Sequence, residues 1–254
     1  MFERPHHRRI ASVLEALDGD QLRTLSCLFG GGTAIALRCG EYRESVDIDF
    51  LVAEAEAYRA LRQMLVGRQD VAALQRPGLP AIAVAREVRA DQYGIRTVLL
   101  VEGARIKFEI VRESRIALDT PGRTDAVCGI ATLSVTDLAA SKLLANSDRW
   151  RDDSAFSRDA IDLAMLDLPP RKLRPAIDKA MEAYGDAVVV DMRRALDRLK
   201  TDPVHVQRCM QAMAMAMPMA LLQQRLLELR RRLERVLAPS RSPTSSACSA
   251  APGR

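Results

Sequence analysis

The chain has 254 residues, enough for one large domain or two small ones, and because 48% are hydrophobic but only 4% aromatic, an aliphatic core is expected. The net charge of +5 mildly favours an anionic partner, although an ordinary basic protein would show the same value. Five cysteines without CxxC spacing argue against a disulfide framework, and no apolar run resembles a signal peptide or membrane span, so we expect a cytoplasmic protein with no membrane partner.

The first 66 residues alternate between helical and extended patterns. Thr33 is expected to cap a short helix that Gly40 closes, because a hydroxyl suits a helix start and glycine suits a helix end. The predicted elements are, in chain order, a helix over residues 8–17, a strand over 25–29, a helix over 34–39, a strand over 45–52 and a helix over 53–66.

The next segment is less regular and then becomes clearly extended. Proline and glycine interrupt residues 68–94, where only 81–85 has a strand pattern. Residues 95–101 and 105–111 are rich in β-formers and separated by a short turn, which predicts a β-hairpin. Glu109 falls on the polar face of the second strand, opposite the apolar face that points into the core.

The second half of the chain has helical periodicity. Helices are expected over residues 136–146, 157–166, 173–184, 187–200, 204–217 and 221–237. The last has a leucine seam with arginines on its outer face; packing on its own domain is favoured over a dimer seam or an RNA-facing helix. The sequence thus predicts an α+β fold, with a mixed α/β domain over 1–125, a helical domain over 126–237 and a disordered tail over 238–254.

The stretch from residue 30 to residue 50 carries the strongest chemical signal. Asp47 and Asp49 are two apart in a predicted strand, so their side chains project to the same face. Two adjacent carboxylates repel one another unless a divalent cation lies between them. Gly31 and Gly32, just before a helix start, suit the close approach of a phosphate. The stretch therefore indicates nucleotide chemistry.

Metal-assisted nucleotidyl transfer fits this combination. Such a reaction needs cations that hold the triphosphate and stabilise the leaving pyrophosphate. Asp47 and Asp49 would hold Mg²⁺, in a one-metal or two-metal site, and Glu109 is the natural third carboxylate. The alternatives are a surface strand end for the aspartates and a solvent-facing side chain for Glu109.

A resemblance to a known family rests on Gly-Gly-Thr-Ala-Ile-Ala-Leu over residues 31–37, then Gly40, Arg43-x-Ser45 and Asp-Ile-Asp-Phe over 47–50. This pattern resembles the AbiEii/AbiGii family of toxin-type nucleotidyltransferases, within the polymerase β-like superfamily. The resemblance implies a nucleotidyltransferase-type mixed sheet followed by a helical domain, with an NTP as substrate. Thr33 takes the place of the superfamily's serine, so its hydroxyl should bond a phosphate.

The resemblance continues into the helical half, through Ala-Ala-Ser-Lys-Leu over residues 139–143 and Arg-Asp-x-x-Asp-Leu over 158–163. It implies that Lys142 contacts the nucleotide phosphates and that Asp159 positions the nucleotide or Lys142. Asp162, three residues further along a helix, could share the face of Asp159. The alternatives are a solvated lysine and ordinary ion pairs between these aspartates and neighbouring arginines.

Two residues beside the aspartates complete the expected site. Arg43 could grip a phosphate, or simply neutralise the acidic pair from a turn. Ser45 shares the face of Asp47 and could bond the triphosphate or the carboxylate, or merely begin the strand.

Other chemistries fit poorly, because the chain has no Walker A motif, no GxSxG motif and only three histidines. The family resemblance implies the toxin of a toxin–antitoxin or phage-defence system, with a tRNA 3′ end as acceptor and a cognate antitoxin as a further partner. One alternative is a small-molecule nucleotidyltransferase of the aminoglycoside-modifying type. Another is a non-catalytic nucleotide-binding or interaction module, against which the intact aspartate pair argues.

Overall fold

A five-stranded mixed sheet organises the first half of the protein in this computed structural model, which describes residues 2–238. Its strand order is β1-β2-β5-β4-β3; β2 and β5 are parallel and the other neighbours antiparallel. The strands are β1 (Leu28–Phe29), β2 (Ile48–Val52), β3 (Ala83–Ala90), β4 (Gly94–Val101) and β5 (Ala104–Arg112). The predicted hairpin is confirmed as β4–β5.

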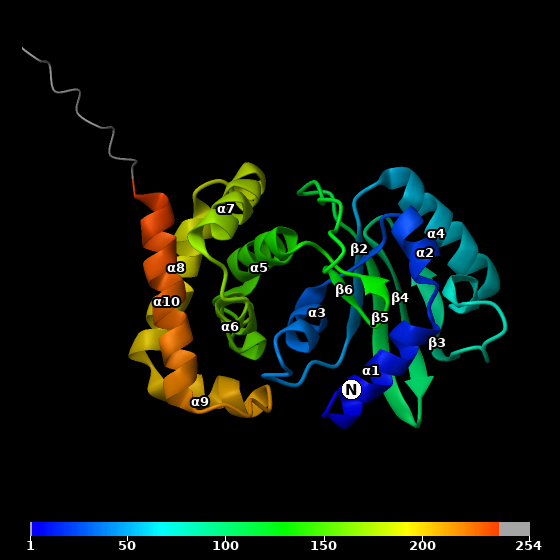
Figure 1. Ribbon diagram of the computed structural model, residues 1–254, viewed down its shortest axis with the longest axis horizontal. Coiled ribbons are helices and arrows are strands. Elements are labelled where there is room, and N and C mark those ends of the chain that lie inside the picture. The colour runs from blue at the N-terminus through cyan, green and yellow to red at the C-terminus, as the bar shows by residue number, and fades with distance from the viewer. Residues whose placement is uncertain (1, 239–254) are drawn as a thin grey trace, which may run out of the picture.

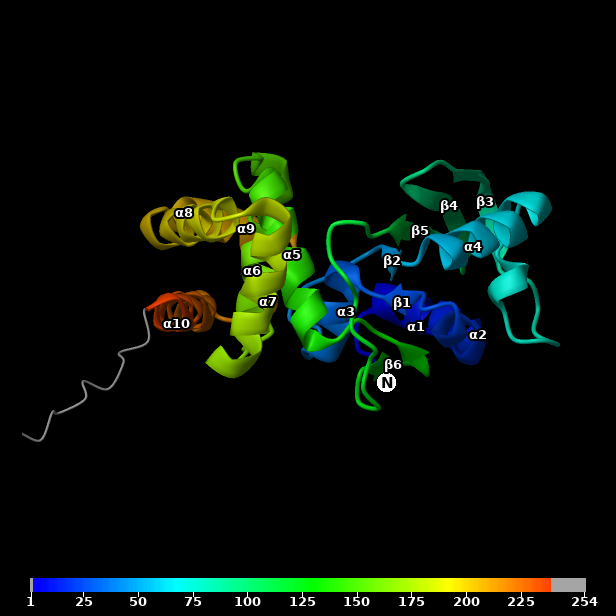
Figure 2. The same ribbon diagram turned by 90° about the horizontal axis from the view of Figure 1, so that it is seen from above.

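One face of this sheet is the core of the α/β half. Phe50 lies between Phe29 and Phe108, with ring centroids 5.7 Å apart in both pairs, and all three side chains are buried. Helices α1 (Pro5–Ala16) and α4 (Ala55–Arg68) add their apolar residues to the same core. Figure 2 shows both helices on one side of the sheet, which leaves the polar alternate residues of β2 and β5 on the other side.

Several predicted boundaries in this half are wrong. The strand expected over 25–29 is only Leu28–Phe29, because Asp18 caps an additional helix, α2 (Gly19–Thr24), by accepting from two backbone N–H groups. The strand expected over 45–52 begins at Ile48, and the one expected over 81–85 is β3, which runs on to Ala90. A short 3₁₀ turn, Ala72–Leu74, precedes β3.

The second half is helical, as predicted, after a small hairpin. The elements are β6 (Ala126–Val127), β7 (Ile130–Ala131), α5 (Val135–Arg149), a 3₁₀ turn (Asp153–Ala155), α6 (Arg158–Met165), α7 (Pro170–Tyr184), α8 (Ala187–Thr201), α9 (Pro203–Ala212) and α10 (Met219–Leu237). The helix expected over 204–217 ends early at Ala212, followed by Ala214 in a left-handed conformation. The tail predicted over 238–254 lies almost wholly outside the described residues.

Helix α10 packs on its own half of the protein, against α6, α7 and α8. Its leucine seam is buried: Leu222, Leu226, Leu229, Leu233 and Val236. The outer arginines are largely paired; Arg230 contacts Asp197 and Glu234, and Arg232 contacts Asp167 and Glu228. The favoured interpretation of this helix is therefore confirmed.

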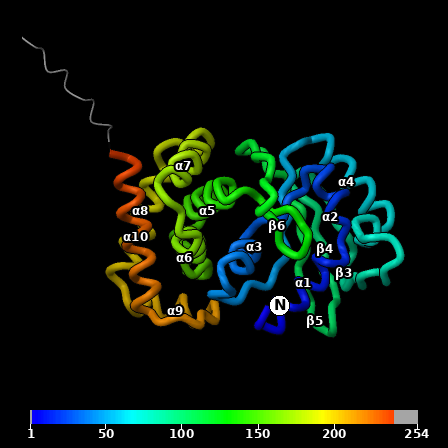
Figure 3. The backbone as a smooth tube through the Cα atoms, in the orientation of Figure 1, coloured from blue at the N-terminus to red at the C-terminus, as the bar shows by residue number. Residues whose placement is uncertain are grey.

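The two halves meet at α3 (Gly31–Arg38), which contacts β2 on one side and α5 and α6 on the other (Figure 1). The turn after α9 also reaches back to the segment before β2, as the trace in Figure 3 shows; the Glu44 N–H donates to the Met213 carbonyl at 2.9 Å. Among the described helices, none is both long and apolar enough to cross a membrane.

Candidate active site

Two aspartates and a glutamate lie on the polar side of the sheet. Asp49 is on β2, opposite Glu109 on β5 in the parallel register, and Asp47 comes one residue before β2 begins. Ile48 and Phe50 alternate with the aspartates and are fully buried in the core. The structure thus brings Asp49 and Glu109 onto neighbouring strands, 60 residues apart in the chain.

The Glu109 carboxylate is paired with cations. It accepts from Arg96 Nε through Oε1 and from Lys107 Nζ through Oε2, both at 2.5 Å. Within residues 2–238, no three His, Cys, Asp or Glu side chains converge closely enough to hold a metal ion. In this structure Glu109 therefore pairs with Arg96 and Lys107 and does not form a three-carboxylate cluster with the aspartates.

The aspartate pair retains an excess of negative charge. Burial, then the neighbouring charge of Asp47, raises the pKa of Asp49 to about 6, and Glu109 adds to the effect while Lys107 opposes it. An ionised Asp49 is thus costly until a cation approaches. Paired hard oxygen donors with unbalanced charge fit a divalent cation such as Mg²⁺.

The glycine turn packs directly against these groups. Gly31 has a φ of +66°, and a Cβ there would lie 2.5 Å from Asp49 Oδ2. A Cβ on Gly32 would lie 2.1 Å from a guanidinium nitrogen of Arg43. Glycine is favoured at Gly31 by its positive φ and the Asp49 carboxylate, whereas a side chain at Gly32 would have to displace the Arg43 guanidinium.

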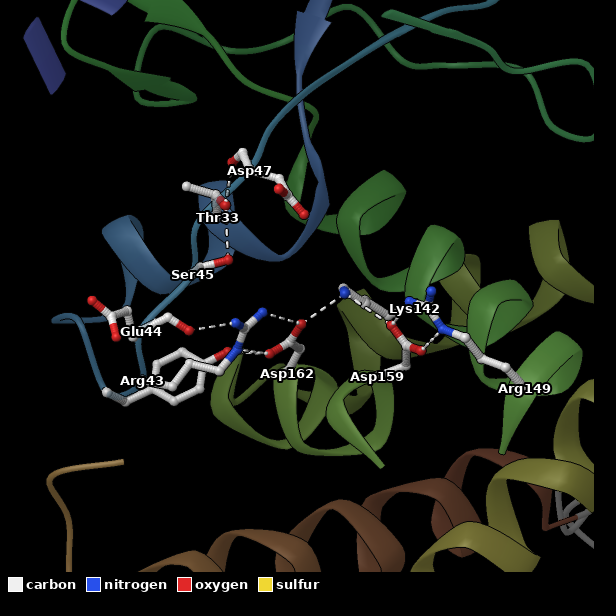
Figure 4. Close-up of polar contacts among 10 residues, drawn as sticks. Thr33, Arg43, Glu44, Ser45, Asp47, Lys142, Arg149, Asp159 and Asp162 are labelled. Atoms are coloured by element: carbon white, nitrogen blue, oxygen red, sulfur yellow. Dashed lines mark hydrogen bonds and ion pairs between the residues drawn. The ribbon is translucent and has the colours of Figure 1, made fainter. Parts of the chain in front are cut away.

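Thr33 and Ser45 fix the backbone that carries Asp47. The buried Thr33 hydroxyl donates to the Asp47 carbonyl at 2.5 Å, so the Ser45 hydroxyl, 2.8 Å away, must donate to Thr33 (Figure 4). The predicted capping role of Thr33 is wrong, since α3 begins at Gly31 after Gly30. Its hydroxyl bonds the chain itself instead of standing free for a phosphate.

His7 is a site-supporting residue that sequence reasoning missed. Its Nε2 accepts from the Ser45 N–H at 3.0 Å, and its Nδ1 lies 2.7 Å from Glu41, so the network assigns the proton to Nδ1. Burial, partly opposed by Glu41, lowers the pKa of His7, which favours this neutral form. No motif identifies His7, because the contact joins α1 to a loop 38 residues away.

Replacing His7 with Leu should leave the buried Ser45 N–H without an acceptor, at a cost of about 1–3 kcal/mol in the free energy of unfolding. Because Ser45 and Thr33 hold Asp47, we also expect the nucleotidyl transfer that the family resemblance implies to fall about ten- to a hundredfold. His7→Gln, which retains an acceptor and a donor, should recover part of both losses. Urea unfolding and steady-state transfer rates measure them; a wild-type transfer rate for His7→Leu would contradict the positioning role.

A row of alternating charges, buried except for the partly exposed Arg149 at its end, joins the two halves (Figure 4). From the loop before β2, Arg43 donates to Asp162 on α6 through Nε at 2.7 Å and through a second guanidinium nitrogen at 3.0 Å. Lys142 on α5 lies between the aspartates of α6, at 2.6 Å from Asp162 and 2.9 Å from Asp159. Arg149 completes the row with two bonds to Asp159, at 2.7 and 2.9 Å.

The ion pairs in this row determine which groups the Asp162 side chain contacts. Asp162 is fully buried, with Tyr42, Arg43 and Lys142 as partners, so its carboxylate is enclosed by those groups and holds them in place. Burial alone would raise the pKa of Asp162, but Lys142 and Arg43 outweigh it and hold the pKa below its usual value. Three cations face two carboxylates, which leaves the row with one excess positive charge.

A cleft of about 510 Å³ lies between the aspartates and the charged row, and its wall comes from both halves of the chain. The predicted residues that line it are Gly31, Gly32, Arg43, Ser45, Asp47, Asp49, Glu109 and Lys142; Asp159, Asp162 and Thr33 lie behind the wall. Arg149 also lines the cleft and was not predicted as a site residue, although its charge and its place on α5 were visible in the sequence.

A solved structure of another protein supports the fold. The crystal structure of JHP933 from Helicobacter pylori superposes with a TM-score of 0.52 at 14% identity, covering 93% of each chain. A second H. pylori structure, of a proposed nucleotidyltransferase, gives a TM-score of 0.42 at 18% identity, covering 91% of this chain and 92% of the other. No curated protein sequence matches the chain.

The family assignment rests on a match that spans nearly the whole described chain. The family model of the nucleotidyl transferase AbiEii toxin, of type IV toxin–antitoxin systems, matches residues 13–238. That range includes the glycine turn, the aspartate pair, the charged row and α10. The protein therefore belongs to the AbiEii nucleotidyltransferase toxin family.

Proposed function

We propose that this nucleotidyltransferase transfers a nucleoside monophosphate from an NTP to the 3′ end of tRNA, with Mg²⁺ as its cation. The observation that carries the proposal is the Asp47–Asp49 pair, which lines a cleft whose opposite wall carries Arg43, Lys142 and Arg149. Negative charge on one wall suits a metal ion, and positive charge on the other suits a triphosphate.

Asp47 and Asp49 are the proposed metal ligands. Glu109 is a third candidate because its backbone is in register with Asp49, although its carboxylate is paired with Arg96 and Lys107. An ion held there supplies charge stabilisation on the triphosphate and lowers the pKa of an attacking hydroxyl. Gly31 keeps the turn close to Asp49, so bound phosphates and the carboxylates would share one small volume.

The chain's own cations are proposed to bind the phosphates. Arg43 and Lys142 line the cleft, and their aspartate partners Asp162 and Asp159 orient them from behind. We also propose that the backbone of Gly31 and Gly32, which lines the cleft, contacts the triphosphate together with Ser45. Asp159 then acts through Lys142, which is one of the two roles expected from the sequence.

The family and the net charge support a proposed acceptor and biological setting. Membership in a type IV toxin–antitoxin family implies an NTP substrate and an antitoxin partner. We propose a toxin that acts in the cytoplasm, as part of phage defence, on tRNA. The net charge of +5 is consistent with a polyanionic acceptor.

The test is to incubate the protein with Mg²⁺, each labelled NTP, and total tRNA, cell protein or aminoglycosides in separate reactions. We expect label in tRNA, lost on Asp47→Ala by at least about a thousandfold because a metal ligand is removed. Asp178→Ala is the control, since Asp178 is an exposed carboxylate on α7. Label only in protein or an aminoglycoside would replace the tRNA proposal, and absence of label with every acceptor would contradict nucleotidyl transfer.

A further inference from the structure

The sheet face that carries Asp49 extends well beyond the cleft. On β5 this face presents Lys107 and Arg105, both exposed, next to Glu109. On β4 it presents Leu100, which is 44% exposed. The face therefore runs from the metal-binding aspartates to the far edge of the sheet as an accessible surface.

The strand register gathers cations on this face. Arg96 on β4 is opposite Glu109 on β5 and opposite Arg89 on β3. Val98, two residues further along β4, is opposite Lys107 on β5 and opposite Arg86 on β3. Directly opposed residues of antiparallel strands share one face. Arg86 and Arg89 are three residues apart, and only the register shift between them lets both project to the same side.

Part of this charge is uncompensated. Arg96 and Lys107 pair with Glu109, and Arg96 also pairs with Asp91, whereas Arg86, Arg89 and Arg105 make no ion pair with any residue of the 2–238 range. Strands lie about 4.8 Å apart, so three spacings place Arg89 about 14 Å from Asp49 across the sheet. Cations spread over several strand spacings suit a polymer with regularly spaced anionic groups better than a single phosphate.

We propose that the basic face, formed by Arg86, Arg89, Arg96, Arg105 and Lys107, binds the phosphate backbone of the acceptor RNA. The proposal rests on the proposed transfer to tRNA and names the surface that receives the tRNA. RNA is favoured because the face is continuous with the aspartates, to which the acceptor hydroxyl must be delivered. Contacts of this type position a nucleic acid without reading its sequence.

The double charge reversal Arg86→Glu/Arg89→Glu tests this, with Arg62→Glu/Arg68→Glu as the matched control. Arg62 and Arg68 are also exposed and without an ion-pair partner in the described range, but they lie on α4, which packs on the opposite side of the sheet. Both variants change the net charge by the same amount. Arg86→Gln/Arg89→Gln is a milder variant, useful if charge reversal disturbs the edge strand.

The probe is a fluorescein-labelled tRNA transcript, whose binding is followed by anisotropy over a range of salt concentrations without NTP. Arg86→Glu/Arg89→Glu should weaken binding at least about tenfold and lower the slope of log K against log salt by about 1.5–2, as expected for two lost phosphate contacts. The Gln variant should give an intermediate loss, and the α4 control should stay within about threefold. NTP-dependent thermal shifts should be unchanged in all three.

These readouts separate the surface from the reaction. Wild-type affinity and salt slope in Arg86→Glu/Arg89→Glu would overturn the basic face, even if tRNA is labelled. An equal loss of affinity in the α4 control would also overturn the basic face, because the loss would then reflect the change in net charge and not the position of the arginines. Selective loss of tRNA binding supports the basic face even where no label reaches tRNA, in which case the proposed reaction alone fails.

Discussion

Replacing Asp49 with Asn is expected to abolish nucleotidyl transfer and at the same time to stabilise the metal-free protein. The transfer rate should fall at least about a thousandfold because one of the two proposed metal ligands is lost. Stability should rise because Asp49 is ionised at neutral pH against burial and the charge of Asp47, which raise its pKa to about 6 from 3.8. That difference corresponds to at most about 3 kcal/mol, and about 1–2 for a half-buried side chain.

The raised pKa of Asp49 sets the direction in which the free energy of unfolding changes with pH. Between pH 3.8 and about 6 the folded protein binds more protons at Asp49 than the unfolded chain does, so this group lowers the free energy of unfolding as pH rises through the window. Its penalty is complete above about pH 6. Protonation also competes with metal binding, so Mg²⁺ affinity should decline as pH falls below about 6.

Thermal unfolding with and without Mg²⁺ at pH 5 and pH 8 measures these effects. The wild type should gain stability from Mg²⁺ more strongly at pH 8, and Asp49→Asn should gain little at either pH. Without metal, Asp49→Asn should unfold at a higher temperature than the wild type at pH 8, with a smaller difference at pH 5. An Asp49→Asn variant less stable than the wild type at pH 8 would contradict the repulsion, and retained transfer would contradict the metal role.

Replacing Asp162 with Ala should cause the largest loss of stability in the site, about 3–5 kcal/mol in the free energy of unfolding. Asp162 is the carboxylate partner of the buried Arg43 and one of two for the buried Lys142, so its removal leaves charge in the interior without compensation. For a protein of this size the unfolding temperature should fall by about 10 °C.

Lys142→Met is the informative comparison. It leaves Asp162 with Arg43 and Asp159 with Arg149, so each buried carboxylate retains an arginine and the stability loss should be clearly smaller. Transfer should nevertheless fall steeply, because Lys142 lines the cleft. Calorimetry measures the stability of both variants, and transfer assays measure their activity. Equal stability losses would contradict the prediction that Asp162→Ala is the more destabilising change. A normal transfer rate in Lys142→Met would contradict a role of this lysine in phosphate binding.

Local patterns in the sequence were sufficient for much of the fold. The hairpin of β4 and β5 and the succession of helices after residue 131 follow from periodicities of two and about 3.6, which act within a few residues. The element boundaries were less accurate where a side chain made an unexpected cap, as Asp18 does for α2. The leucine seam of α10 likewise identified its buried side correctly.

In the candidate site, too, some features depend on neighbouring residues alone and others depend on tertiary packing. By itself the sequence determined that Asp47 and Asp49 share a face and that glycines precede them, because both depend on neighbouring residues. It could not determine that Asp162 lies 2.7 Å from Arg43, 119 residues away, or that His7 holds Ser45. Those contacts depend on how α6 and α1 pack against the loop before β2. Only the tertiary structure decides them, because a buried charge or hydrogen bond is set by whichever partner the packing brings within about 3 Å.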